Sequence, residues 1–260
     1  MRDHAQTVAV ITGGSQGLGL AIAERLLAEG CPQMIIAGRG VMKGEEAAER
    51  LRETGAEVRF LPVDMGDPQD AIDLINRAAT RFGRVTALVN AAAATDRGSI
   101  LDTTPASWDG LMAVNARGPF FALQRFAQLA IENGHPAQAV NILSMVVHCG
   151  QSFLAPYSAS KAALANVTKN AAQALRAHRI RVNAINCGWM DTPGEDATQR
   201  RYHGAGDDWL AQAEAAQPMG MLVNPVHVAG LASYMLSAAS GVMTGAVVDF
   251  DQNVSGAYPE

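Results

Sequence analysis

Short runs of apolar residues alternate along the chain with longer stretches in which apolar residues recur at helical spacing. Several of the short runs are almost continuously apolar, which is typical of parallel strands that are buried on both faces of a sheet. We therefore predict seven strands, at residues 7–12, 34–37, 58–63, 87–90, 139–143, 181–186 and 246–250.

The stretches between these strands have the length and periodicity of helices. They predict helices at residues 18–29, 44–53, 68–82, 106–132, 156–177 and 225–236. Alternation of strands and helices without repeats or linkers indicates βαβ units. We expect one α/β domain over residues 1–260, with a doubly wound, seven-stranded, mostly parallel sheet of the Rossmann type. Ligands of such folds bind at the carboxyl ends of the strands.

The segment at residues 191–218 departs from this alternation, because it is long, polar and rich in charged side chains. It follows the carboxyl end of the sixth predicted strand, so it is placed to cover a ligand. We predict a substrate lid there. The alternative is a solvated excursion that touches no ligand.

Composition narrows the class of protein. The chain of 260 residues is 48% hydrophobic and 17% charged, which is enough apolar material for a sizeable core. Its formal net charge is −5 at pH 7, and lysine and arginine form no cluster. Nucleic acid and anionic membranes are therefore not expected as partners.

Cysteine and histidine usage points the same way. Cys31, Cys149 and Cys187 are odd in number and widely spaced, which favours free, mostly buried thiols in a reducing compartment. The six histidines form no pair at ligand spacing, so no metal site is expected. The N-terminus leads directly into an apolar strand without a signal peptide, and no apolar run reaches membrane-spanning length. We expect a soluble, cytoplasmic protein.

A glycine-rich turn, Thr-Gly-Gly-Ser-Gln-Gly-Leu-Gly from Thr12 to Gly19, joins the first predicted strand to the first predicted helix. Glycines allow a tight turn and a close approach to a pyrophosphate, which the helix N-terminus attracts. Such a turn is a weak signal by itself, but here it opens a βαβ unit, as a dinucleotide site requires. The predicted contacts are Gly13, Ser15, Gln16, Gly17, Leu18 and Gly19.

Arg39 follows the second predicted strand, where a dinucleotide fold contacts the adenosine ribose. A carboxylate there would accept from the ribose hydroxyls, whereas a guanidinium can pair with a 2′-phosphate. The sequence therefore favours NADP over NAD. The alternative is that Arg39 stacks on adenine or points to solvent.

Tyr157 and Lys161 stand four residues apart on a predicted helix, so both project from one face. A tyrosine titrates near pH 10, and a neighbouring ammonium favours the phenolate by lowering the pKa. Pro156 suits the first helical position, which places Tyr157 in the first turn, where the helix dipole also favours negative charge. With Ser144 as a hydrogen-bond partner, this group could exchange a proton with an alcohol or carbonyl. The tyrosine–lysine pair alone is a weak signal, and by itself it favours an ordinary surface helix.

The order and spacing of these motifs resemble the compact short-chain dehydrogenase/reductase family over nearly the whole chain. The glycine turn matches the family's cofactor loop, and Ser144, Tyr157 and Lys161 match its catalytic set. The resemblance implies a catalytic role for Asn115 and cofactor contacts at Asp64, Met65, Asn90, Tyr157, Lys161, Gly188 and Thr192.

This resemblance implies hydride transfer between a nicotinamide and a secondary alcohol or carbonyl, without a metal. Tyr157 would be the general acid in reduction and the base in oxidation. Lys161 would lower its pKa and hold the nicotinamide ribose, and Ser144 would orient the substrate oxygen. Asn115 would position a water that connects Lys161 to solvent. The family's long helices build subunit interfaces, so a homotetramer is implied.

Three places depart from the family pattern. Ala91 and Ala93 replace an asparagine and a glycine, which we expect to alter packing behind the adenosine. Cys187 replaces a proline, so the loop entering the lid is expected to be less rigid. Residues 250–252 read Phe-Asp-Gln where many relatives have glycines, which puts bulk and a carboxylate near an expected subunit interface.

The substrate contacts expected from the sequence are Ser144, Val146, His148, Gln151, Tyr157 and Trp189. A pocket that mixes histidine, glutamine and charged lid residues favours a small hydroxylated compound such as a sugar or polyol. One alternative is a 3-oxoacyl-thioester reductase, which would use Arg200 and Arg201 to receive an acidic carrier; the net acidity counts against it. An alternative from another class is an NADP-sensing regulator without turnover, which would not need a complete proton-transfer set.

Overall fold

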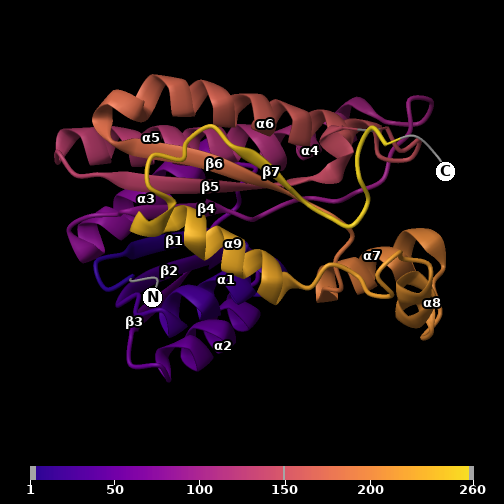
Figure 1. The fold of residues 1–260 in the computed structure, drawn as a ribbon, viewed down its shortest axis with the longest axis horizontal. Helices are drawn as coiled ribbons and strands as arrows, with labels where there is room; N and C mark the ends of the chain where they lie inside the picture. Colours follow the sequence, from indigo (N-terminus) through magenta and orange to yellow (C-terminus); the bar gives the residue numbers. More distant parts are fainter. Residues whose placement is uncertain (1–3, 149, 258–260) are drawn as a thin grey trace.

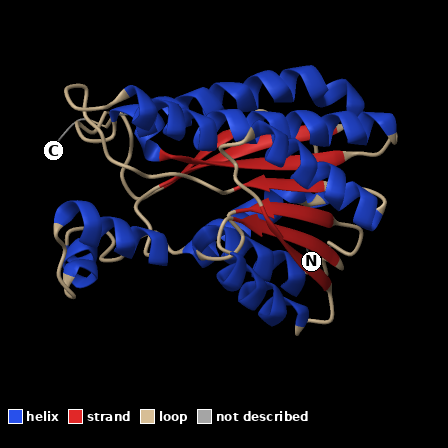
Figure 2. Cartoon of the chain, turned by 180° about the vertical axis from the view of Figure 1, so that it is seen from behind, coloured by secondary structure: helices blue, strands red, loops and turns tan. Residues whose placement is uncertain are grey.

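A parallel sheet with helices on both faces forms the centre of the protein (Figures 1 and 2). The computed structural model describes residues 4–148 and 150–257. Within these residues the sheet has seven strands in the order β3-β2-β1-β4-β5-β6-β7, and every ladder is parallel. The strands are β1 (Val8–Thr12), β2 (Gln33–Gly38), β3 (Glu57–Pro62), β4 (Ala87–Asn90), β5 (Ala137–Ser144), β6 (Ile180–Cys187) and β7 (Val247–Phe250).

These strands confirm the predicted fold, with bounds that differ from the predicted ones by at most two residues. The chain builds outward from β1 to β3 and then returns to place β4 on the other side of β1. The carboxyl ends of β1 and β4 therefore flank the point at which the strand order reverses. Ligand sites of open α/β sheets form at this point.

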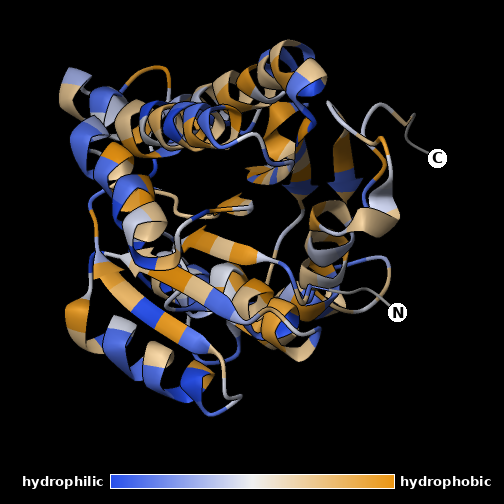
Figure 3. Cartoon of the chain, turned by 90° about the vertical axis from the view of Figure 1, so that its left-hand side faces the viewer, coloured by the Kyte–Doolittle hydropathy of each residue, from blue (hydrophilic) through white to orange (hydrophobic). Residues whose placement is uncertain are grey.

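Helices cover each face of the sheet and enclose one apolar core per face. One face carries α1 (Gly17–Ala28), α2 (Val41–Arg52) and α9 (Pro225–Leu236), and the other carries α3 (Pro68–Phe82), α5 (Gly118–Glu132) and α6 (Ala155–Leu175). Ile22 and Ile36 are fully buried on the first face, and Leu74 and Phe126 on the second. The central strands are accordingly hydrophobic along most of their length (Figure 3).

The helix predicted at residues 106–132 is interrupted. It consists of α4 (Pro105–Met112), a π-helical turn at Ala113–Arg117 and α5. A π-helical turn inserts one residue into the α-helical repeat, which hydrophobic periodicity over a long window does not register. This turn contains the fully buried Asn115, so the irregularity lies at a predicted site residue.

Helix α2 begins three residues earlier than predicted, and Gly44 lies inside it. A Cβ on Gly44 would overlap the ring of Phe60 on β3, so this glycine lets the helix pack closely on the edge strand. The glycine marks close packing here and does not mark a helix start.

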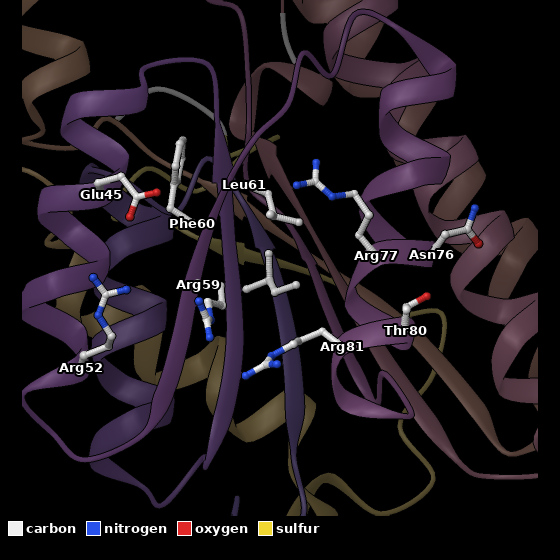
Figure 4. Close-up of a pocket in the computed structure, with 10 residues that line it drawn as sticks. Glu45, Arg52, Arg59, Phe60, Leu61, Asn76, Arg77, Thr80 and Arg81 are labelled. Atoms are coloured by element: carbon white, nitrogen blue, oxygen red, sulfur yellow. The ribbon is translucent and has the colours of Figure 1, made fainter.

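The exposed edge of the sheet at β3 is rich in arginine. A cavity of about 710 Å³ lies there between α2 and α3, and Figure 4 shows Arg52, Arg59, Arg77 and Arg81 around it. Arg59 and Arg81 both pair with Glu57 on the edge strand. Charged side chains on an edge strand discourage pairing with other strands. None of the described residues that line this cavity belongs to the site predicted from the sequence.

The predicted lid segment holds two helices, α7 (Pro193–His203) and α8 (Trp209–Ala215), which project beyond the carboxyl edge of the sheet (Figure 1). Throughout the described part of the chain, no helix is both long enough and apolar enough to cross a membrane.

Candidate active site

A cavity of about 1080 Å³ opens at the carboxyl ends of the strands. The glycine-rich turn, the ends of β2, β5 and β6, and the first turns of α6 and α7 contribute to its walls. Most residues predicted from the sequence line it: Gly13, Ser15, Gln16, Gly17, Leu18, Gly19, Arg39, Asp64, Met65, Ser144, Val146, Gln151, Tyr157, Lys161, Gly188, Trp189 and Thr192.

The glycine-rich turn has the geometry of a pyrophosphate site. Gly13 and Gly17 have φ values of 68° and 54°, in the left-handed region that favours glycine. A Cβ on Gly19 would overlap the carbonyl oxygen of Gly13, so the turn is closed too tightly for a side chain. Among described side chains none caps the N-terminus of α1, and its first turn holds no acidic residue. The N–H groups of this helix end are therefore available to an anion, as a dinucleotide requires.

Two cations stand at the adenosine end of the cavity. Arg39 is exposed after β2, and Lys43 lies in the first turn of α2, where its Nζ donates to Gln16 Oε1 at 2.8 Å. Lys43 was not predicted as a site residue, because the helix was expected to begin after it, at Gly44. Asp64 lies at the far side of this end, and its Oδ1 accepts from the backbone N–H of Gly66 at 2.9 Å.

The proton-transfer group is assembled from β5 and α6. Ser144 ends the strand and its hydroxyl makes a hydrogen bond with Tyr157, which lies in the first turn of the helix. Helix α6 begins at Ala155, so Pro156 takes the second helical position and not the first. Lys161 Nζ donates to the carbonyl oxygen of Ile142 at 2.9 Å and lies 5.8 Å from the centroid of the Tyr157 ring.

The expected lowering of the tyrosine pKa is wrong for this structure. Burial of the phenol raises the pKa of Tyr157 to about 12, although the hydrogen bond from Ser144 acts in the opposite direction. Lys161 is only 2% exposed, and burial lowers the pKa of its ammonium to about 8. The sequence analysis counted the attraction between the two groups and omitted the cost of removing both from water, which dominates here.

Asn115 supports the site through hydrogen bonds to two neighbouring segments. Its Oδ1 accepts from the backbone N–H of Ala94 at 2.8 Å, and its Nδ2 donates to the carbonyl oxygen of Ala94 at 2.9 Å and to Ser160 Oγ at 3.0 Å. Ser160 in turn donates to the carbonyl oxygen of Tyr157 at 2.7 Å. Asn115 thus connects the loop after β4 to the helix that carries the tyrosine. The water relay to Lys161 stays a prediction.

Two predicted contacts do not lie on the cavity wall. Asn90 is 2% exposed and donates to Asn141 Oδ1 at 2.8 Å, because its side chain falls on the face of the sheet that α5 and α6 cover. His148 lies 2.8 Å from Asp249 Oδ1 and 3.0 Å from Asn186 Nδ2, which hold its ring over the ends of β6 and β7. Both side chains support the walls of the site, and neither reaches into it.

The segment at residues 250–252 contacts the site, and its place near a subunit interface stays a prediction. Asp251 lines the cavity, and its carboxylate occupies the space where a side chain on Gly188 would stand. Gln252 accepts from the N–H of Met219 at 2.8 Å and donates to the carbonyl oxygen of Met221 at 2.7 Å, so it fastens the end of the lid segment.

The other departures from the family pattern lie at the cavity wall, at Ala91, Ala93 and Cys187. Cys187 and Cys31 are buried free thiols, and burial raises their pKa values to about 12 and about 11. Cys149 lies outside the described residues. Ala91 packs against the core that α1 covers, and Ala93 lines the cavity. In residues 4–148 and 150–257, no group of three His, Cys, Asp or Glu side chains is arranged to hold a metal ion.

Helix α7 lies against the loop that follows β4. Thr198 Oγ1 lies 3.4 Å from Thr95 Oγ1, and Tyr202 donates its phenolic hydrogen to Asp96 at 2.7 Å. Lid residues including Glu195, Gln199 and His203 line the cavity, so the alternative of a solvated excursion without contact to the site is not supported. Closure of this segment over a ligand stays a prediction.

Arg97 and Phe153 are site residues that the sequence analysis missed. Arg97 follows β4, at the strand end where ligands bind, and Phe153 precedes α6. The guanidinium carbon of Arg97 lies 5.6 Å from the centroid of the Phe153 ring. The position of Arg97 after a predicted strand could have identified it as a site residue. Its contact with the lid could not be predicted from the sequence.

Comparisons with known proteins place these features in a family. A family model described as short chain dehydrogenase matches residues 7–203. The chain is 34% identical over 246 residues to an NADP-dependent (R)-specific alcohol dehydrogenase of Lentilactobacillus kefiri, covering 93% of this chain and 94% of the relative. It is 32% identical over 244 residues to a 2-dehydro-3-deoxy-D-gluconate 5-dehydrogenase of Dickeya dadantii, covering 94% and 93%. A solved actinorhodin polyketide ketoreductase with NADPH has a TM-score of 0.88 at 27% identity, covering 96% of this chain and 97% of that one.

Proposed function

Because the chain belongs to the short-chain dehydrogenase/reductase family, we propose that it transfers a hydride between NADP(H) and a small hydroxylated alcohol or carbonyl compound. The family membership makes the protein an oxidoreductase that acts on CH–OH or C=O groups. The observation that carries the proposal is one cavity that joins the uncapped start of α1 to the group Ser144, Tyr157 and Lys161. An anion-binding end and a proton-transfer end are the two parts that such a reaction needs.

The protein's own residues supply the proton and the orientation. With a pKa of about 12, the phenol of Tyr157 is protonated at pH 7, which is the form that donates to a carbonyl oxygen in reduction. Ser144 is placed to hydrogen-bond the same oxygen. When bound, the nicotinamide supplies or accepts the hydride. Lys161 remains largely protonated at pH 7 with a pKa of about 8, so it adds positive charge beside the reacting group.

NADP is favoured by the two cations at the adenosine end, Arg39 and Lys43. A guanidinium and an ammonium at this place pair with a 2′-phosphate, and no carboxylate follows β2 to accept from the ribose hydroxyls. The alcohol dehydrogenase relative is named as NADP-dependent, and the ketoreductase was solved with NADPH. Both observations support the same preference.

A small hydroxylated substrate is supported by polar side chains at the catalytic end of the cavity, including Gln151, Glu195 and Gln199. One relative is named for a sugar acid, 2-dehydro-3-deoxy-D-gluconate. An acidic carrier protein is a poorer fit, because Arg200 pairs with Asp196 and Asp207, and Arg201 with Asp96. The lid arginines are therefore already neutralised by neighbours.

The replacement Tyr157→Phe tests the catalytic assignment. We expect it to remove nearly all turnover while the affinity for NADPH, measured by fluorescence titration, stays within a few-fold. The ring that lines the cavity is kept and only the proton donor is lost. Retained turnover would refute the role of Tyr157. Turnover by the wild type would itself argue against an NADP-sensing regulator without catalytic activity.

The replacement Arg39→Gln tests the cofactor preference. Loss of a charge-assisted contact to the 2′-phosphate should lower the ratio of NADP to NAD affinity by about 10-fold or more. Arg50→Gln is the matched control, because Arg50 lies on α2 outside the cavity and pairs with Glu24. An equal ratio in both variants would argue against Arg39 as the phosphate contact.

A homotetramer stays a proposal. Trp108 on α4 and Phe120 on α5 are 43% and 42% exposed, which supports the burial of these helices against other subunits. Size-exclusion chromatography with light scattering at micromolar concentration tests it, and a monomer would contradict it.

A further inference from the structure

Arg97 is a half-buried cation at the catalytic end of the cavity. It extends from the loop after β4, and Phe153 and the lid residue His203 line the same cavity. Although burial dominates and raises the pKa of Tyr157, the charge of Arg97 acts to lower it. The guanidinium therefore lies within electrostatic range of the proton donor.

The guanidinium contacts an imidazole, a backbone carbonyl and two aromatic rings. Its Nε and Nη2 lie 3.3 Å from His203 Nε2, and its Nη1 donates to the carbonyl oxygen of Thr95 at 3.0 Å. The rings of Phe153 and Tyr202 lie 5.6 and 5.9 Å from the guanidinium carbon. An arginine has five N–H groups, so the two terminal nitrogens retain hydrogens that these contacts do not use.

No carboxylate in the described chain pairs with Arg97. Its neighbour Asp96 is engaged by Tyr202 and Arg201. Three acids line the cavity, and each accepts hydrogen bonds from other groups: Asp64 from the N–H of Gly66 at 2.9 Å, Glu195 from Trp189 at 2.8 Å and Gln199 at 2.7 Å, and Asp251 from the N–H of Gln252 at 2.8 Å. The lid arginines Arg200 and Arg201 have acidic partners, so Arg97 differs from them in both place and pairing.

Arg97 therefore has a positive charge and unused N–H groups on the cavity wall without an acidic partner, so an anionic ligand can pair with it. We propose that the substrate carries a carboxylate, which Arg97 binds while Tyr157 and Ser144 engage the reacting oxygen. This inference rests on the proposed function and narrows its substrate class to hydroxy- or oxo-carboxylates. The planar fork of an arginine matches a carboxylate in two hydrogen bonds, which would fix the substrate's orientation as well as its affinity.

The test compares an acid with its neutral counterpart. NADPH-dependent reduction of 4-oxocyclohexanecarboxylate is measured beside that of its primary amide, which keeps the ring and the ketone and removes the charge. We expect the wild-type kcat/KM for the acid to exceed that for the amide by about 10- to 100-fold, mainly through KM.

Arg97→Gln should bring the ratio of kcat/KM for the acid to that for the amide close to one, since the charged contact to the carboxylate is lost. Arg97→Lys keeps the charge without the fork and should retain part of the preference. Arg201→Gln is the matched control: the guanidinium of Arg201 also lies over the ring of Tyr202, at 4.8 Å, but does not line the cavity. It should leave the ratio of acid to amide unchanged.

An equal ratio in the wild type and Arg97→Gln would overturn the inference and leave the proposed oxidoreductase function standing. If the wild type reduces neither compound, calorimetric titration of the acid into the enzyme–NADPH complex decides about Arg97 by itself. Tighter binding to the wild type than to Arg97→Gln would support the contact, and no binding or equal Kd values would overturn it.

Discussion

The replacement Lys161→Met tests how far the buried ammonium of Lys161 lowers the free energy of unfolding, separately from its effect on turnover. Lys161 is 2% exposed on α6, and burial lowers the pKa of its ammonium from 10.5 to about 8. At about 1.4 kcal/mol per pKa unit, keeping the ammonium protonated inside the folded protein costs about 3 kcal/mol. Methionine has a similar length and no charge, so the variant should be more stable than the wild type. The gain is reduced by the lost hydrogen bond to Ile142.

The difference in free energy of unfolding between Lys161→Met and wild type depends on pH only through the charge of Lys161. Below pH 8 both the folded and the unfolded chain hold the proton, so the full cost is present. Between about pH 8 and 10.5 only the unfolded chain holds it, and the cost falls as the pH rises. The free-energy difference of unfolding between variant and wild type should therefore shrink by about 2 kcal/mol from pH 7 to pH 9.5. Packing and hydrogen-bond terms do not change over this range, so they cancel.

Urea unfolding of both proteins at the two pH values, followed by circular dichroism, measures this difference. Lys169→Met is the control, because it removes an exposed ammonium from the same helix and corrects for the general effect of one charge on α6. A difference between Lys161→Met and wild type that stays constant from pH 7 to pH 9.5, or that grows, would refute the reasoning. Turnover of the variant should be strongly reduced even if it is more stable.

Two further replacements test the packing around the site. Gly19→Ala should destabilise the fold by about 1–3 kcal/mol and weaken NADPH binding, because its Cβ would overlap the carbonyl oxygen of Gly13. Thermal unfolding and cofactor titration measure both effects, and Gly110→Ala, which meets open space in α4, should be neutral or stabilising. Thr168→Val should cost about 1–3 kcal/mol in chemical unfolding, because it removes the acceptor of the buried Asn141 amide, which lies 2.9 Å away. Thr168→Ser keeps the hydroxyl and should restore most of the loss; equal stability of the valine and serine variants would contradict this.

The strands, their parallel arrangement and the glycine-rich turn at the site could be predicted from the sequence alone. These features are local, since an apolar run of strand length or a glycine turn before a helix contains its signal within about ten residues. The order of the motifs then placed Ser144, Tyr157 and Lys161 at one edge of the sheet. Asn115 was identified as a site residue in the same way, although its bonds to Ala94 and Ser160 were not.

The direction of side chains and the balance of charge depend on contacts that form only in the folded protein. Asn90 and His148 are near the site in sequence but point elsewhere, because partners about fifty to a hundred residues away hold them. The pKa of Tyr157 rises where spacing predicted a fall, because desolvation depends on depth in the folded protein. The contact between Arg97 and His203 exists only because the lid segment lies against the loop after β4. The burial and the charge pairing of a side chain depend on many neighbours that are distant in the chain. Both are therefore known only from the folded structure.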